Sequence, residues 1–229
     1  MELANLSQKF KTDLDEFKFF FQNLIDIKNP SPSQLSFNRM ISIDPLESSS
    51  HVDSQRVDIA FMYSEPLVRR TSLGVFSAQD LVEFQEDCRK KLEILKKKQR
   101  KVNAYFEIAT VGHLVEVLSM SPKILHIMCH GDRNVFYLHF ENERGGLEEV
   151  YADQLRDIIK HVNFETKLVF ANACHSLEVA KVFTNTNVPC EIAIQSELKI
   201  SEDIALKFSE SFYCQLFMGK SIDESFKNA

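Results

Sequence analysis

The stretches ILHIMCHGD (residues 124–132) and KLVFANACHS (residues 167–176) decide the fold of this chain. Each is a run of β-branched and large apolar residues, and a helical pattern separates them, which is typical of buried strands in a parallel sheet. Each run stops at a chemically reactive side chain, His130 in the first and Cys174 in the second. We therefore expect both side chains at the carboxyl-terminal end of one sheet.

These two strand ends predict a catalytic pair. Neighbouring parallel strands lie roughly 4.8 Å apart, so an imidazole and a thiol just beyond two strand ends come within reach of each other. Open α/β sheets also bind their ligands at this end. A thiolate can attack a carbonyl carbon while an imidazole transfers protons. Gly131 follows His130, and a residue without a side chain lets substrate approach and offers its N–H to an oxyanion.

A strand that ends in His130-Gly131, followed by one that ends in Asn172-Ala173-Cys174, resembles the caspase-like cysteine peptidases, which include caspases, separases, gingipains and legumain. Within that clan the endings are most similar to those of the CHAT domain, and the resemblance runs from about residue 56 to the C-terminus. It implies a three-layer αβα sandwich with a mostly parallel central sheet and an inserted β-hairpin.

The resemblance also implies an activity, that of a cysteine endopeptidase without a cofactor. His130 and Cys174 would form a catalytic dyad, and the N–H groups of Gly131 and Cys174 would form the oxyanion hole. Enzymes of this kind cleave a protein or peptide substrate and are often latent until a partner protein activates them. Substrate selection in the clan depends on the residue before the cleaved bond. Asp132 and Glu197 lie on loops that follow strands, and we expect them to suit a basic residue there.

Two other hypotheses remain open. A catalytically inactive CHAT fold would serve as an interaction module. The pairs Cys129-His130 and Cys174-His175 also make up a Cys₂His₂ set of the kind that zinc binds. Neighbouring residues of a strand point to opposite faces, which makes convergence of all four on one ion awkward. We therefore expect Cys129 to pack into the sheet, His175 to begin the next helix, and no metal to be bound.

The pattern along the chain predicts three parts. Residues 1–28 carry apolar side chains three and four positions apart, which predicts an amphipathic helix that packs on the main domain or meets a partner helix. Residues 29–55 contain prolines and many serines and predict a linker. Residues 56–229 predict the main domain, with strands at 57–63, 102–108, 124–130, 167–173 and 190–194 and a hairpin between 135 and 151. Helices are expected after residues 77, 110, 174, 201 and 221, and one more capped by Asp153.

Composition argues against several classes of protein. A net charge of −6 and a pI near 5.7 disfavour a nucleic-acid binder, which needs a basic surface. No apolar run approaches the roughly 20 residues of a membrane span, and the N-terminus lacks the layout of a signal peptide. The dinucleotide, P-loop and HExxH motifs are missing. Five scattered cysteines without CxxC spacing predict reduced thiols, so we expect a cytoplasmic protein.

Overall fold

The computed structural model describes residues 57–77, 90, 93, 102–131, 137–186, 188–194 and 201–229. The predicted N-terminal helix (1–28), the linker (29–55) and most of the helix expected after residue 77 lie outside the described residues, as do Asp132 and Glu197.

Five parallel strands form the central sheet, in the order β4-β1-β5-β8-β9. The strands are β1 (Ile59–Tyr63), β4 (Ala104–Ile108), β5 (Ile124–Met128), β8 (Leu168–Asn172) and β9 (Cys190–Ala193). All five residues of β5 are buried, because this strand lies in the middle of the sheet and both of its faces are covered. The predicted parallel sheet is therefore confirmed.

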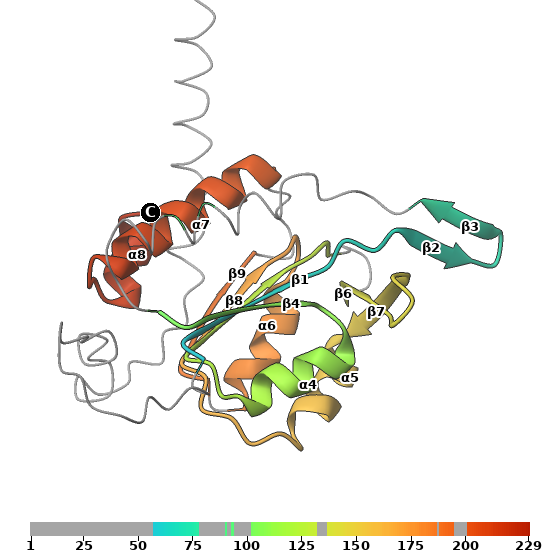
Figure 1. Ribbon diagram of the computed structural model, residues 1–229, viewed down its shortest axis with the longest axis horizontal. Coiled ribbons are helices and arrows are strands. Elements are labelled where there is room, and N and C mark those ends of the chain that lie inside the picture. The colour runs from blue at the N-terminus through green and yellow to red at the C-terminus, as the bar shows by residue number, and fades with distance from the viewer. Residues whose placement is uncertain are drawn as a thin grey trace, which may run out of the picture.

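Helices cover both faces of this sheet (Figure 1). Helices α4 (Val111–Ser119), α5 (Ala152–Ile159) and α6 (Leu177–Thr184) pack on one face, and α7 (Glu202–Phe217) and α8 (Ile222–Lys227) on the other. Side chains alternate between the faces, as in any strand, and most of the buried core residues fall into two large clusters. Leu125 and Ile127 belong to the cluster beneath α4, α5 and α6, whereas Ile124 belongs to the one beneath α7 and α8. This arrangement confirms the predicted three-layer αβα sandwich.

His126 is a core residue. Its side chain is fully buried, and its Nδ1 lies 2.8 Å from the hydroxyl oxygen of Tyr213 on α7. Its ring also stacks on Phe170 with 4.4 Å between ring centroids. These contacts offset the cost of burying a polar ring, so His126 needs no functional explanation.

Most of the predicted helix starts that fall within the described residues are confirmed. The Thr110 hydroxyl caps α4 by accepting the N–H of His113 at 3.0 Å, and Ser221 and Glu224 form the expected capping box at the start of α8. The prediction for Asp153 is wrong, because α5 begins at Ala152 and Asp153 lies in its first turn. Strand β7 runs straight into α5, whose N-cap residue is Tyr151, the last residue of β7. The side chain of Gln154 accepts the N–H of Tyr151 at 3.0 Å.

Two β-hairpins stand outside the central sheet. Strands β6 (Tyr137–Glu141) and β7 (Leu147–Tyr151) form the hairpin that the sequence predicts between β5 and β8. Strands β2 (Val68–Thr71) and β3 (Gly74–Ser77) form a second hairpin, which the sequence pattern did not reveal. This arm projects from the domain (Figure 1). None of the described helices is long and apolar enough to cross a membrane.

Candidate active site

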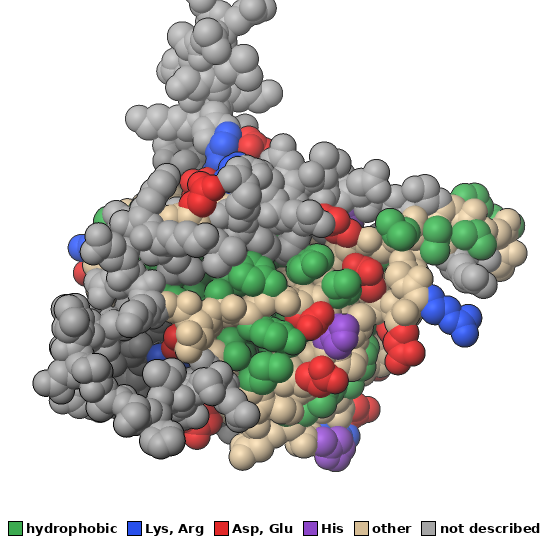
Figure 2. Space-filling view, in the orientation of Figure 1, with side chains coloured by type: hydrophobic (Ala, Val, Ile, Leu, Met, Phe, Trp, Pro, Cys, Tyr) green, Lys and Arg blue, Asp and Glu red, His purple; other side chains and the backbone are tan. Residues whose placement is uncertain are grey.

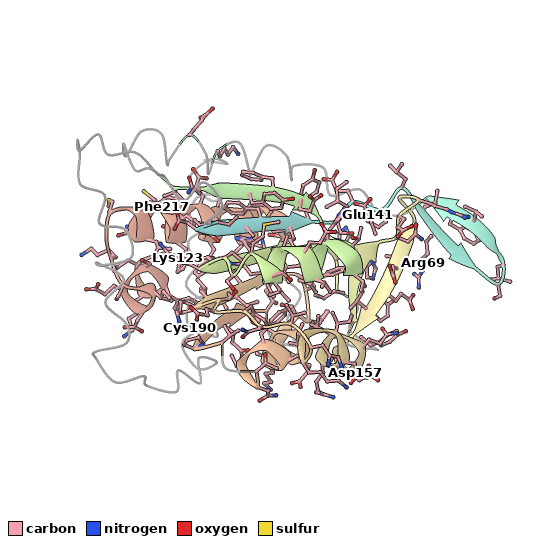
Figure 3. The ribbon with its side chains drawn as sticks, turned by 60° about the horizontal axis from the view of Figure 1, so that its bottom comes forward. Arg69, Lys123, Glu141, Asp157, Cys190 and Phe217 are labelled. Carbon is pink, nitrogen blue, oxygen red and sulfur yellow. The ribbon has the colours of Figure 1, made fainter. Side chains whose placement is uncertain are left out.

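The carboxyl-terminal end of the sheet carries the residues that the sequence singles out. Lys123, which precedes β5, and Cys190, the first residue of β9, mark the amino-terminal end of the sheet, and Glu141 and Arg69 lie at the opposite end (Figure 3). His130 follows the last residue of β5 by two positions. Cys174 follows the last residue of β8 by the same interval, so both lie just beyond neighbouring strands.

The register of β5 and β8 brings these two residues to the same level. Every pair between the strands joins residues 44 positions apart, for example Met128 with Asn172, and His130 and Cys174 are separated by the same number. The N–H of Cys129 donates to the Asn172 carbonyl at 3.4 Å, which carries the pairing one residue beyond the strands. The predicted proximity of the two strand ends therefore follows from the ladder itself.

Gly131 touches the backbone of Cys174. A Cβ atom at position 131 would overlap the carbonyl oxygen of Cys174 and lie 3.0 Å from its carbonyl carbon. Such distances are too short for any real side chain, so only glycine fits here. The sequence predicted close approach of a substrate at this glycine, whereas the close approach in the structure is between two loops of the protein itself.

The loop that carries Cys174 is fixed by a buried serine. The Ser176 hydroxyl donates to the Ala171 carbonyl at 2.9 Å and accepts the N–H of Ile194 at 3.1 Å. Ser176 is fully buried, and the next residue, Leu177, donates its N–H to the Ile194 carbonyl at 3.1 Å. One hydroxyl thus ties the end of β8, the start of α6 and the end of β9 together.

His175 lies in the turn before α6 and not within the helix, so the prediction that it begins the helix is wrong. Its backbone φ of 57° is in the left-handed region, which residues other than glycine adopt infrequently. Helix α6 begins only at Leu177, with Ser176 as its N-cap residue. The left-handed turn is needed because the chain reverses direction between β8 and α6 within a few residues.

The β6–β7 hairpin holds the His130 loop from the other side. The N–H of His139 on β6 donates to the carbonyl of His130 at 2.9 Å, and Gly131 pairs with Leu138 in an antiparallel bridge. The rings of His130 and His139 meet edge to face with 6.0 Å between centroids. The backbone at His130 is therefore held between β5 and β6.

Burial sets the protonation states at this site. Partial burial lowers the pKa of His130 below its ordinary value, which favours the neutral imidazole that a general base requires. Burial raises the pKa of the Cys129 thiol far above its usual range, and the neighbouring Cys174 raises it further. Cys129 is thus an inert core thiol, as predicted, whereas Cys174 is only half buried.

One nitrogen of the His130 imidazole is unsatisfied. Nε2 of His130 is buried without a hydrogen-bond partner among the described residues. Catalytic hydrogen bonds are often long in an enzyme without substrate. This nitrogen is therefore available to a substrate or to a rearranged side chain.

An aromatic wall continues from His139 along the hairpin. Tyr137 stacks on His139 with 5.2 Å between centroids and contacts Tyr151 at 5.1 Å. The Tyr151 hydroxyl donates to Glu149 at 2.9 Å, and Arg69 of β2 forms an ion pair with the same carboxylate at 3.3 Å. These contacts link the arm formed by β2 and β3 to His139, whose ring contacts that of His130.

A hollow of about 560 Å³ lies elsewhere on the surface, against β2 and the β6–β7 turn. Its lining includes Val68, Glu143 and Glu148 but neither His130 nor Cys174. It is therefore separate from the two strand ends. Within the described part of the chain, no group of three or more His, Cys, Asp or Glu side chains could hold a metal ion.

Sequence reasoning missed two residues that build this site. Ser176 and His139 fix the backbone on either side of the strand ends. A serine two positions after Cys174, just before a helical pattern, is a capping signal that the sequence does contain. The contact of His139 with His130 depends on how the hairpin packs, and no local pattern encodes it.

Comparison with known protein families gives one match. A profile of the CHAT domain matches residues 29–229, most of the chain. No curated protein sequence matches the chain.

Proposed function

The chain belongs to the CHAT domain family, whose context is the caspase-like clan, and we propose that it is a cysteine endopeptidase that uses Cys174 and His130. The observation that supports the proposal is the pairing of β5 with β8, because His130 and the half-buried Cys174 each follow the end of one of these neighbouring strands by two residues. Family membership alone gives the fold, and a site must be argued from its residues.

In the proposed reaction, His130 removes the proton from the Cys174 thiol, and the sulfur attacks the carbonyl carbon of the scissile bond. The N–H groups of Gly131 and Cys174 stabilise the oxyanion that forms. The protonated imidazole then gives its proton to the leaving amine, and a thioester remains on Cys174. Water, activated by His130, hydrolyses the thioester and restores the thiol.

In the conformation described the proposed enzyme reacts slowly with a substrate. Nε2 of the His130 ring is buried without a hydrogen-bond partner among the described residues, so proton transfer through this nitrogen requires a rearrangement. A protein partner that shifts the loops at this end of the sheet would activate the enzyme. The thiol must also stay reduced, which a cytoplasmic location provides.

Labelling with an electrophilic probe tests the proposal. A peptide acyloxymethyl ketone should label the wild type and not Cys174→Ala, while Cys214→Ala, which removes another half-buried thiol, should label normally. The His130→Ala variant should lose peptidase labelling but keep alkylation of Cys174 by iodoacetamide. If iodoacetamide modifies Cys174 but no peptide probe does so faster than it modifies Cys214, the peptidase proposal fails.

Asp132 and Glu197 are the proposed determinants of a basic residue before the cleaved bond. A peptide library with Lys or Arg at that position should be cleaved faster than one with Asp. Asp132→Asn and Glu197→Gln should reduce this preference. Faster cleavage of the Asp library would refute the assignment.

The second candidate function is a catalytically inactive interaction module. The buried Nε2 of His130, which has no hydrogen-bond partner among the described residues, favours it, and so do the exposed apolar side chains of the arm formed by β2 and β3. Such a protein would show no peptide-dependent labelling under any activating condition, yet it would keep its fold and its association with a partner when Cys174 is replaced by alanine.

A further inference from the structure

The arm formed by β2 and β3 is fixed to the domain only at its base among the described contacts. The N–H of Leu67 donates to the Gly145 carbonyl at 3.0 Å, Val68 forms a parallel bridge with Gly146, and Arg69 pairs with Glu149 at 3.3 Å. All of these contacts involve β2 or the residue before it. Strand β3 runs antiparallel beside β2, and Figure 1 shows the arm extending beyond the rest of the domain.

Large apolar side chains on this arm are exposed to solvent. The exposed fractions are 73% for Leu67, 88% for Leu73, 59% for Val75 and 50% for Phe76. Figure 2 shows apolar side chains gathered along the arm at the right of the molecule. Val75 and Phe76 are neighbours in a strand and point to opposite faces, so neither face of the arm is covered. A two-stranded hairpin with two open faces is only marginally stable in water.

The outer strand of the arm lacks the features that prevent strands from pairing between molecules. Within the described residues, β3 pairs with β2 alone. Monomeric proteins protect such an edge with charged residues, proline or bulges. The segment from residue 72 to 78, SLGVFSA, contains no charged residue and no proline. The edge strand β3, with its exposed Val75 and Phe76 side chains, is therefore suited to receive another strand.

Charge favours a second copy of the same strand as the occupant. The arginines of the arm, Arg69 and Arg70, both lie on β2, whereas β3 is uncharged. Pairing of β3 with β3 would give the order β2-β3-β3-β2, in which the two arginine-bearing strands lie three spacings apart, roughly 14 Å. This exceeds the Debye length of about 8 Å at physiological ionic strength, so the two copies would not repel each other there.

Shape also favours self-pairing. An antiparallel pair of identical strands has a two-fold axis, and centring the axis on Val75 places Val75 against Val75 and Gly74 against Phe76. Gly74 carries no side chain, and the atoms nearest to a Cβ at this position belong to the ring of Phe76 in the same strand, 4.0 Å away. An aromatic residue opposite a glycine is a favourable pair in sheets. The same patch then serves both partners, which is what a two-fold dimer requires.

We propose that the chain forms a two-fold dimer in which the β3 strands of two copies pair antiparallel about Val75, making a four-stranded sheet. The proposed dimer is independent of the proposed peptidase function.

The mass of the full-length protein in solution tests this inference. The wild type should elute in size-exclusion chromatography with light scattering at twice the chain mass of 26.4 kDa at micromolar concentration. Val75→Lys places two like charges on the axis and should yield the monomer. Met218→Lys, which replaces another exposed apolar residue, 46% exposed on a different surface, should leave the dimer intact. Circular dichroism should show the same folded content in all three.

A cross-link at the same position tests the geometry. Because Val75 lies on the axis, Val75→Cys should form a disulfide between two copies under mild oxidation, seen as a dimer on a non-reducing gel. Met218→Cys and the wild type should not. A monomeric wild type, or a dimer that Val75→Lys does not separate, would overturn the proposal. If Val75→Lys abolishes capture of a different protein while the wild type is monomeric, the arm has another occupant and the dimer is refuted.

Discussion

Replacing Ser176 by alanine gives the sharpest test of how the Cys174 loop is built. The hydroxyl makes two hydrogen bonds in a fully buried position, one to the Ala171 carbonyl and one from the Ile194 N–H. Removing it leaves a buried N–H without its acceptor, which costs about 1–3 kcal/mol, and loses a second bond with a net value of about 1 kcal/mol. The expected loss is therefore roughly 2–4 kcal/mol, and the melting temperature of a domain of this size should fall by roughly 4–16 °C.

Ser225→Ala is the matched control. Ser225 is also fully buried, but its hydroxyl has no hydrogen-bond partner in the described structure. Removing an unsatisfied buried hydroxyl should change stability by less than about 0.5 kcal/mol or increase it. Urea unfolding measures both variants, and the slope of the transition must be unchanged for the comparison to hold. Equal midpoints for the two variants would refute the role assigned to Ser176.

Two further predictions concern the strand ends. Gly131→Ala should destabilise the protein by roughly 1–3 kcal/mol, because the new methyl group overlaps the Cys174 carbonyl, and urea unfolding would show no shift if the two loops are not in contact. His130 makes stability depend on pH. Its pKa is lowered in the folded state, so the unfolded chain binds the proton more readily, and stability is full above the ordinary pKa of 6.5 and falls as the pH drops below it. His130→Gln should flatten this decline in urea midpoints, and identical pH profiles for the two proteins would contradict the assignment.

The central sheet could be predicted because each of its strands is recognisable from a local sequence pattern. Ile124 to Met128 is a continuous apolar run and is buried throughout, so the sequence pattern and the burial agree. The helix caps at Thr110 and Ser221 are equally local, since each depends on a side chain three residues from its partner. The strand ends at His130 and Cys174 follow from these strands without further information.

The arm and the supports of the site could not be predicted in this way. Strand β2 reads VRRT and β3 reads GVFS, four residues each, without the alternation that identifies a strand with one buried face. The contact of His139 with His130 joins a hairpin to a strand end through packing, and this depends on how far the hairpin folds back. The close approach of Gly131 to the Cys174 backbone likewise depends on how near the two loops lie in the folded protein, which the sequence of neither loop encodes.

The two sides of the candidate site differ in how firmly they are held, and this difference indicates which side moves to form the dyad. The Cys174 loop is tied to β8 and β9 by the Ser176 hydroxyl and by Leu177, whereas no described hydrogen bond holds Nε2 of the His130 ring. The imidazole is therefore the part that rotates toward the sulfur, and its present contact is with the ring of His139. His139→Ala removes that ring but keeps the backbone N–H that supports the His130 carbonyl, so we expect faster labelling of Cys174 by a peptide probe. Slower labelling would mean that His139 positions His130 for catalysis and does not hold it away from Cys174.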